Sequence, residues 1–304
     1  MSKSFDDQGV QFAWDATSIG YAQTCLRYYK YKMIDGYSPR GRSVHLRFGG
    51  HYATALEHYY KHLALGVDEE EALILVVHEA LTDTWDRTEE DPVGKPWDSM
   101  DTNKTRETLI RTIVWYVEHF RKEPTPVIHL ANGKPAVEYS FTLPVDNGLV
   151  FSGHIDRLVT YHGDIYVMDQ KTTGGTVGPY FFDQFSPNTQ MSMYSFAGRA
   201  IYGAPVMGVI IDAAQVAVNF SRFERGFTGR TEAQLEEWYE TAMYHIEKAQ
   251  TAVREDYFPM NPSACGNYGG CPFRKICNKP ERLRNNFLEA DFDKLPPWDP
   301  LERR

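Results

Sequence analysis

The sequence predicts a mixed α/β fold, and three observations support this prediction. The first third carries apolar residues at helical spacing, the middle changes to short strand-like segments separated by turn signals, and helix and strand patterns then alternate before a cysteine-rich tail. Helices and strands that alternate in this way are typical of a mixed sheet covered by helices. At 304 residues the chain is long enough for one large domain or two modest ones.

The first third is expected to be helical because its apolar positions recur with a period near that of an α-helix. Four helices are expected, at residues 17–34, 51–65 (after Gly49 and Gly50), 68–87 and 104–121. The third begins with acidic residues, which suit a helix N-terminus. The fourth carries an apolar stripe, and the prolines at 124 and 126 are expected to stop it.

Three segments rich in Val, Ile, Tyr and Phe follow, at residues 136–145, 149–160 and 164–172. The turn signals Asp146-Asn-Gly148 and His162-Gly-Asp164 lie between them, so a three-stranded antiparallel meander is expected. A helix at 189–202, strands at 205–217 and 221–227, and a helix from Thr231 to Arg254 are expected next. Thr231-x-x-Gln234 resembles a capping box. The remainder, from Pro259, is expected to be rich in loops.

The composition is that of a soluble globular protein, with 42% hydrophobic and 24% charged residues. No stretch approaches the roughly 18 to 20 continuous apolar residues that span a bilayer. Residues 1–10 are polar and acidic, without the basic start and apolar run of a signal peptide. We therefore expect no membrane association and a cytoplasmic location.

The most informative residues are Asp156 on one predicted strand and Asp169 with Lys171 on the next. Alternation along a strand puts Asp169 and Lys171 on the same sheet face. Pairing across the turn at 162–163 puts Asp169 opposite Asp156, close enough for both carboxylates to hold one hard cation such as Mg²⁺. These charges could instead be solvent-facing, but Val167 and Met168 show that they interrupt a strongly apolar strand.

These residues resemble two motifs of the RecB-like PD-(D/E)XK nucleases, a group that includes the AddB nuclease domain and the CRISPR-associated RecB-like exonucleases. The matching runs are Gly153-x-x-Asp156-Arg157 and Asp169-x-Lys171-Thr172-Thr173. The family's next signature, Gln-hydrophobic-x-x-Tyr, is present as Gln190-Met191-Ser192-Met193-Tyr194. Residues 190 and 194 share a helix face.

The resemblance implies a single nuclease domain over residues 1–304 with a restriction-endonuclease-like core. Its parts would be a helical N-terminal part (1–125), a nuclease core with a central mixed sheet (126–258) and a cysteine-rich tail (259–304). It also implies hydrolysis of DNA phosphodiesters by a water activated by Mg²⁺ or Mn²⁺. Asp156 and Asp169 would bind the metal, Lys171 would orient the nucleophile, and Gln190 and Tyr194 would position the substrate.

One family motif is incomplete in this sequence. The family usually carries Gly-x-x-x-His-x-x-x-Glu on a helix, with the His as a metal ligand, but alignment on Gly49 and Glu57 places Ala53 at the His position. His51 lies two residues earlier, which on a helix turns the side chain by about 200°. His51 would therefore serve only with a later helix start or a different register. Otherwise the metal would depend on Asp156, Asp169 and the Gln170 carbonyl, with help from Glu57.

The four cysteines form a second candidate site. Cys25 lies on the first predicted helix, and Cys265, Cys271 and Cys277 follow one another in a polar stretch with little core to fill. In a cytosolic protein, clustered cysteines favour metal binding over disulfides, and four thiolates suit either a four-iron cluster or tetrahedral zinc. The resemblance to RecB-like nucleases favours a [4Fe-4S] cluster that joins the first helix to the tail.

The formal net charge of -9 argues against a general nucleic-acid coat. A nuclease remains compatible with this charge, because a metal site is itself acidic and DNA can be held by local basic clusters. Candidate clusters lie at residues 27–32, 40–47 and 274–284. The expected substrate is single-stranded DNA or duplex ends, in recombination or repair, with a helicase as one conceivable partner and a phage or bacterial cell as the setting.

Two alternatives belong to other classes of protein. A nuclease-inactive DNA-binding or assembly subunit would keep the fold and the cluster, and Ala53 favours this alternative while the Asp-x-Lys motif opposes it. A zinc-stapled binding module would lack the brown colour of an iron–sulfur protein.

Overall fold

The computed structural model describes residues 4–41, 43–122, 125–202 and 206–302. The chain divides into two compact units: unit 1 comprises Met1–Gly41, Ser140–His154 and Arg230–Arg304, and unit 2 comprises Arg42–Tyr139 and Ile155–Gly229. Three expectations fall outside the described residues: the helix stop at Glu123 and Pro124, the strand start at Pro205, and Arg42 in a basic cluster.

Unit 2 is built on a mixed sheet, as the sequence predicted. Its strands are the second half of β6 (Val150–Tyr161), β7 (Asp164–Thr173), β8 (Val206–Val216) and β9 (Ser221–Thr228), in the order β6-β7-β8-β9. The β6–β7 and β8–β9 pairs are antiparallel, whereas β7 and β8 are parallel. β8 is buried along nearly its whole length, which explains its continuous apolar sequence.

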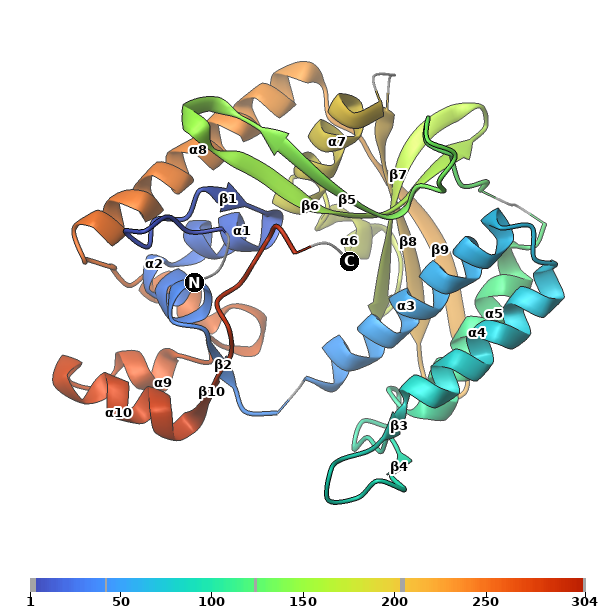
Figure 1. The fold of residues 1–304 in the computed structure, drawn as a ribbon, viewed down its shortest axis with the longest axis horizontal. Coiled ribbons are helices and arrows are strands. Elements are labelled where there is room, and N and C mark those ends of the chain that lie inside the picture. Colours follow the sequence, from blue (N-terminus) through green and yellow to red (C-terminus); the bar gives the residue numbers. More distant parts are fainter. Residues whose placement is uncertain (1–3, 42, 123–124, 203–205, 303–304) are drawn as a thin grey trace. The chain divides into compact units, whose positions relative to one another are not determined.

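Two groups of helices cover the two faces of this sheet (Figure 1). α3 (Val44–Ala64), α4 (Glu69–Asp83) and α5 (Arg106–Phe120) share a core with Ala214 and Phe223 of β8 and β9. On the other face, α7 (Thr189–Tyr202) approaches β7 so closely that a Cβ on Gly198 would lie 3.1 Å from Val167. Glycine at this point allows the helix and the strand to touch.

Several elements of unit 2 differ from the sequence expectation. The second expected helix begins at Val44 rather than after the glycines, so Gly49 and Gly50 lie inside α3. The apolar stripe from Phe48 to Tyr59 is buried and stabilises the helix despite the two glycines. The short strands β3 (Trp85–Asp86) and β4 (Lys95–Pro96) and the short helix α6 (Pro179–Asp183) were not predicted.

Unit 1 contains the other helices. The first expected helix is interrupted at Cys25, which is extended, and it therefore forms α1 (Ala16–Thr24), α2 (Leu26–Tyr29) and the π-helix η1 (Lys30–Ile34). α8 (Glu232–Arg254) begins with the predicted capping box. The tail is more ordered than expected, with η3 (Pro262–Gly269), α9 (Arg274–Cys277) and α10 (Glu281–Asp291).

Short strands complete unit 1. β1 (Ala13–Trp14) pairs in parallel with the first half of β6, and β5 (Val137–Pro144) forms a hairpin with β6 through the turn η2 (Asp146–Gly148). β2 (Tyr37–Pro39) pairs with β10 (Phe292–Lys294). No helix formed by the described residues has the length and apolar composition that crossing a bilayer requires.

Lys104 in unit 2 is an unusual cation because it is only 2% exposed. Its Nζ lies 4.4 Å from the centre of the Phe48 ring and has no hydrogen-bond partner among the described residues. Burial lowers the pKa of Lys104 to about 8, and the nearby Asp101 opposes this shift only in part. At neutral pH the protein therefore keeps a poorly solvated ammonium group in its interior.

We expect Lys104→Met to stabilise the protein at pH 7, by about 1–3 kcal/mol. The pKa of Lys104 is lower in the folded than in the unfolded protein. The destabilisation caused by its buried charge is therefore complete below pH 8 and disappears as the pH rises towards 10.5. Urea unfolding at pH 7 and pH 10 measures the difference between variant and wild type. The gain should shrink at the higher pH, and a pH-independent gain would mean that packing alone is responsible.

Candidate active site

The hairpin of β6 and β7 brings the two predicted acids together. Arg157 pairs with Met168 across the two strands, which places Asp156 directly opposite Asp169 on one face of the sheet. The backbone N–H of Gln170 donates a hydrogen bond of 2.8 Å to Asp156 Oδ2, so the Asp156 carboxylate is held against β7. The two acids are therefore neighbours in space, as the alternation of the strands predicted.

Asp169 is the more deeply buried of the two acids, with its side chain only 1% exposed. Burial raises the pKa of Asp169 to about 6; the nearby Lys171 ammonium opposes this shift, and the charge of Asp156 adds to it. Lys171 forms an ion pair with Asp169 and keeps 29% of its side chain exposed. One ammonium thus faces two carboxylates, an arrangement that leaves net negative charge for a cation.

α7 places the predicted Gln and Tyr over the same sheet face. Asn188 accepts hydrogen bonds from the N–H groups of Gln190 and Met191 and so caps the start of the helix. Gln190 Nε2 donates a hydrogen bond of 3.1 Å to the hydroxyl of Tyr194. Burial raises the pKa of Tyr194 well above its ordinary value, and the charges of Asp156, Asp169 and Glu138 raise it further. Its hydroxyl therefore lies in the field of these carboxylates.

His51 and Glu57 both lie on α3, where each has a neighbour outside the pair of acids. The His51 ring centre lies 5.9 Å from that of Trp97, and Glu57 forms an ion pair with Lys61 one turn along α3. In the described part of the chain, no three His, Cys, Asp or Glu side chains converge closely enough to hold a metal ion directly. Because α3 begins seven residues before His51, the later helix start that would turn His51 towards the acids does not occur.

The four cysteines lie in one region of unit 1 and are all free and half-buried, but among the described residues no three of them are placed to hold a metal ion. Cys25 Sγ accepts a hydrogen bond of 3.3 Å from the backbone N–H of Asn261. Burial raises the pKa of Cys271, and so do the charges of Cys277, Cys265 and Cys25. Burial also raises the pKa of Cys277, against which Arg27 acts. Cys25 thus shares the electrostatic environment of the three tail cysteines, although about 240 residues of chain separate them.

The opposite face of the sheet holds a buried ionic group that the sequence analysis did not predict. Arg157, next to Asp156 in the chain, points away from the two acids and donates a hydrogen bond of 3.0 Å to Asp212 Oδ2. Arg225 Nε lies 3.4 Å from the other oxygen of Asp212. The Arg157 guanidinium stacks on the Tyr60 ring at 3.7 Å. The arginine of the Gly-x-x-Asp-Arg motif is therefore a structural residue.

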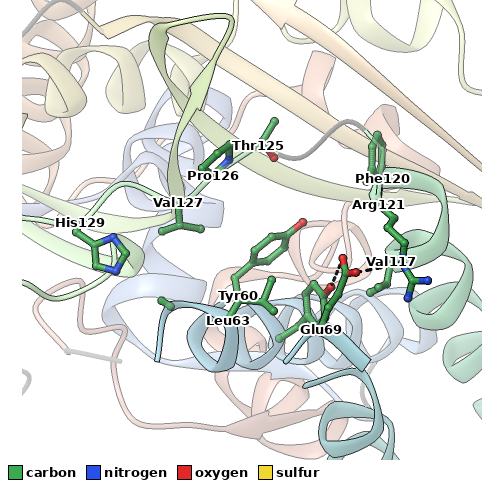
Figure 2. Close-up of a pocket in the computed structure, with 12 residues that line it drawn as sticks. Tyr60, Leu63, Glu69, Val117, Phe120, Arg121, Thr125, Pro126, Val127 and His129 are labelled. Carbon is green, nitrogen blue, oxygen red and sulfur yellow. Dashed lines mark hydrogen bonds and ion pairs between the residues drawn. The ribbon is translucent and has the colours of Figure 1, made fainter. Parts of the chain in front are cut away.

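A pocket of about 250 Å³ also opens in unit 2, between α3, α5 and the segment at 125–129. Figure 2 shows its polar side, where Glu69 forms an ion pair of 3.1 Å with Arg121. Glu69 also accepts a hydrogen bond of 3.3 Å from the Tyr59 hydroxyl. None of its lining residues belongs to the candidate site. Because the Arg121 guanidinium is already paired with Glu69, this pocket is poorly suited to a phosphate group.

Unit 2 thus contains a mixed sheet with two acids and a lysine on neighbouring strands. Residues 13–278 match the family model of the PD-(D/E)XK nuclease superfamily, and the chain belongs to this superfamily. The search of curated proteins gave no match.

Among solved structures, the chain is similar to a candidate exonuclease from Eubacterium rectale, with a TM-score of 0.51 and 11% identity over 92% of this chain and 93% of the other. At this identity the likeness supports the fold alone. A second similarity, to the protein SSO0001, has a TM-score of 0.30 and 11% identity over 77% of this chain and 76% of the other.

Proposed function

We propose that this protein is a Mg²⁺- or Mn²⁺-dependent deoxyribonuclease of the RecB-like type that acts as an exonuclease on DNA ends or single strands. The observation that carries the proposal is the pairing of Asp156 and Asp169 on adjacent strands, with Lys171 beside them. A carboxylate as buried as Asp169 is costly without a cation, and oxygen ligands of this kind suit hard divalent ions. The donor set therefore fits such an ion.

The residues of the site divide into three roles. Asp156 and Asp169, with the Gln170 carbonyl, would hold the cation, which when bound supplies a polarised phosphate and a water of lowered pKa. Lys171, half-exposed beside Asp169, would orient the attacking water and balance charge on the phosphate. Gln190 and Tyr194, already hydrogen-bonded to each other, would position the substrate strand.

The experiment that tests this function is digestion of DNA with free and with closed ends. Linear single-stranded and duplex DNA, labelled at either end, and circular single-stranded DNA are incubated with Mn²⁺ or Mg²⁺. Degradation of the linear substrates with survival of the circles is expected, and EDTA should stop the reaction. Cleavage of circles would favour an endonuclease. Absence of cleavage under every condition would favour the alternative function, an inactive DNA-binding or assembly subunit.

We also propose that Cys25, Cys265, Cys271 and Cys277 hold a [4Fe-4S] cluster that joins the start of unit 1 to its tail. Their shared electrostatic environment supports this assignment. A cluster needs four thiolates. Burial raises the pKa of Cys277, and the Arg27 guanidinium opposes this shift and so favours the thiolate form. Zinc is the alternative, because it accepts the same four ligands.

Protein purified without oxygen is expected to be brown, to absorb near 400 nm and to contain about four irons per chain. Cys277→Ser should lower the iron content and the absorbance and should destabilise unit 1, because the staple between its segments is weakened. Metal analysis together with a thermal melt measures both effects. A colourless protein that contains one zinc per chain would contradict the iron–sulfur assignment and support the zinc alternative.

A further inference from the structure

Glu138 on β5 lies in the candidate site although no sequence motif includes it. Its position follows from the pairing of β5 with β6. Three contacts between these strands each join two residues that lie equally many positions before and after Asn147 in the chain. These contacts are Val145 N to Leu149 O (2.9 Å), the Ser140 hydroxyl to His154 Nδ1 (2.8 Å), and Leu158 N to Ala136 O (2.9 Å). The same register places Glu138 opposite Asp156.

Glu138, Asp156 and Asp169 therefore form one row across three neighbouring strands. One step beyond the Arg157–Met168 pair, the β6–β7 register puts Asp156 opposite Asp169. The β5–β6 contacts above put Glu138 opposite Asp156 from the other side. Directly opposed residues have Cβ atoms about 4.5–5.5 Å apart. Three acids in such a row repel one another unless a cation lies among them.

Tyr194 gives an independent indication that Glu138 belongs to this group. Besides burial, the negative charges that raise the pKa of Tyr194 come from Asp156, Asp169 and Glu138. All three carboxylates thus act on one phenol hydroxyl, which α7 supplies from above the sheet. This hydroxyl marks the side of the sheet on which the three charges meet.

The backbone of Glu138 is also strained. Its φ of 46° lies in the left-handed region, which is unfavourable for a residue with a Cβ. Such a conformation inside a strand changes the direction of the side chain relative to a regular strand. Strained backbone of this kind persists only where surrounding contacts hold it in place, and it is found most often at active sites and ligand-binding sites.

We propose that Glu138 is a positioning residue of the metal site, which supplies a third negative charge and holds the divalent cation through a bound water. Among the described residues no three acidic, His or Cys side chains converge closely enough for direct ligation, and contact through a bound water is compatible with this spacing. This inference rests on the proposed nuclease function. Groups that orient metal ligands in this way typically change metal affinity on the order of tenfold when removed.

The test is the affinity of the purified protein for Mn²⁺ without DNA, measured by calorimetry. Glu138→Gln is expected to bind Mn²⁺ about tenfold more weakly than wild type, and Glu138→Asp, which keeps the charge, should stay within about threefold. Glu118→Gln is the matched control, since it removes one charge from an exposed position on α5 and should leave the affinity unchanged. Glu138→Ser, measured in parallel, prevents the result from depending on one variant that fails to fold.

Wild-type affinity in folded Glu138→Gln or Glu138→Ser would overturn the role of Glu138, and so would equal losses in the Gln and Asp variants. Failure of the proposed function has a different signature. In that case wild type would neither bind Mn²⁺ nor cleave DNA, and Asp169→Asn would behave like wild type. Weaker Mn²⁺ binding by Glu138→Gln, together with DNA cleavage by wild type, supports both the nuclease function and the role of Glu138.

Discussion

Asp169→Asn is expected to lower the rate of DNA cleavage at least 10³-fold, the largest effect that the structure predicts. Loss of the cation that polarises the phosphate removes several kcal/mol of transition-state stabilisation, and each 1.4 kcal/mol corresponds to tenfold in rate. Asn keeps the shape of the side chain but not its charge. Lys171→Ala should cause a similar loss, because the water and the phosphate then lose their ammonium partner.

Folding of the variant is not expected to suffer. Burial raises the pKa of Asp169 from 3.8 to about 6. The free energy of unfolding of the metal-free protein therefore falls as the pH rises from 3.8 towards 6, because the buried carboxyl group must ionise. Asp169→Asn should therefore melt no lower than metal-free wild type at pH 7. Added Mn²⁺ should raise the melting temperature of wild type but not of Asp169→Asn.

The matched control for Asp169 is Asp164→Asn, an exposed position at the start of the same strand. It should cleave end-labelled DNA at the wild-type rate. The initial rate of DNA cleavage with excess enzyme is measured for wild type and the three variants, with Mn²⁺ and with Mg²⁺. Equal rates for wild type, Asp169→Asn and Lys171→Ala would remove the assigned site.

The pairing of Asp156 with Asp169 was predictable because it depends on local signals. The turn at His162–Gly163 fixes the register of β6 and β7, and the period of two along a strand then decides which side chains share a face. The order of helices and strands was predictable for a similar reason, since each long element carries its own apolar period. The mixed sheet in unit 2 confirms this part of the prediction.

Features that depend on tertiary contacts were not predictable in the same way. Glu138 is one acid in a strand of ordinary composition, and only the hairpin register and the α7 tyrosine connect it with Asp156. The interruption of the first helix at Cys25 has no local cause in the sequence, because no glycine or proline lies there. α3 begins early because burial of Phe48 outweighs the low helix propensity of two glycines.

Asp212 is the clearest example of a residue whose importance becomes visible only in the fold. In the sequence it is one acid in an apolar run, whereas in unit 2 its side chain is 1% exposed and meets two buried arginines, Arg157 and Arg225. The arginines come from β6 and β9, on either side of the parallel β7–β8 pair. This group therefore links the outer strands of the sheet that carries the candidate site.

Asp212→Asn is expected to destabilise unit 2 by about 3–5 kcal/mol, because it leaves two buried guanidinium groups without a counter-charge. Glu224→Gln provides the matched control: Glu224 pairs with Arg222 at an exposed position on β9, and loss of that pair should cost at most about 1 kcal/mol. Urea unfolding followed by circular dichroism measures both. A cost below 1 kcal/mol for Asp212→Asn would mean that the buried charges are solvated by water.

A double variant separates charge from packing. Removing one cation as well, in Asp212→Asn with Arg157→Met, should cost less than the two single changes added together. Asp212→Asn alone leaves both Arg157 and Arg225 without a counter-charge, whereas the double variant leaves only Arg225. A strictly additive result would mean that the two residues stabilise the sheet independently. The expected coupling would instead show that Arg157 and Asp212 stabilise the sheet as one group, next in the chain to Asp156, the proposed metal ligand.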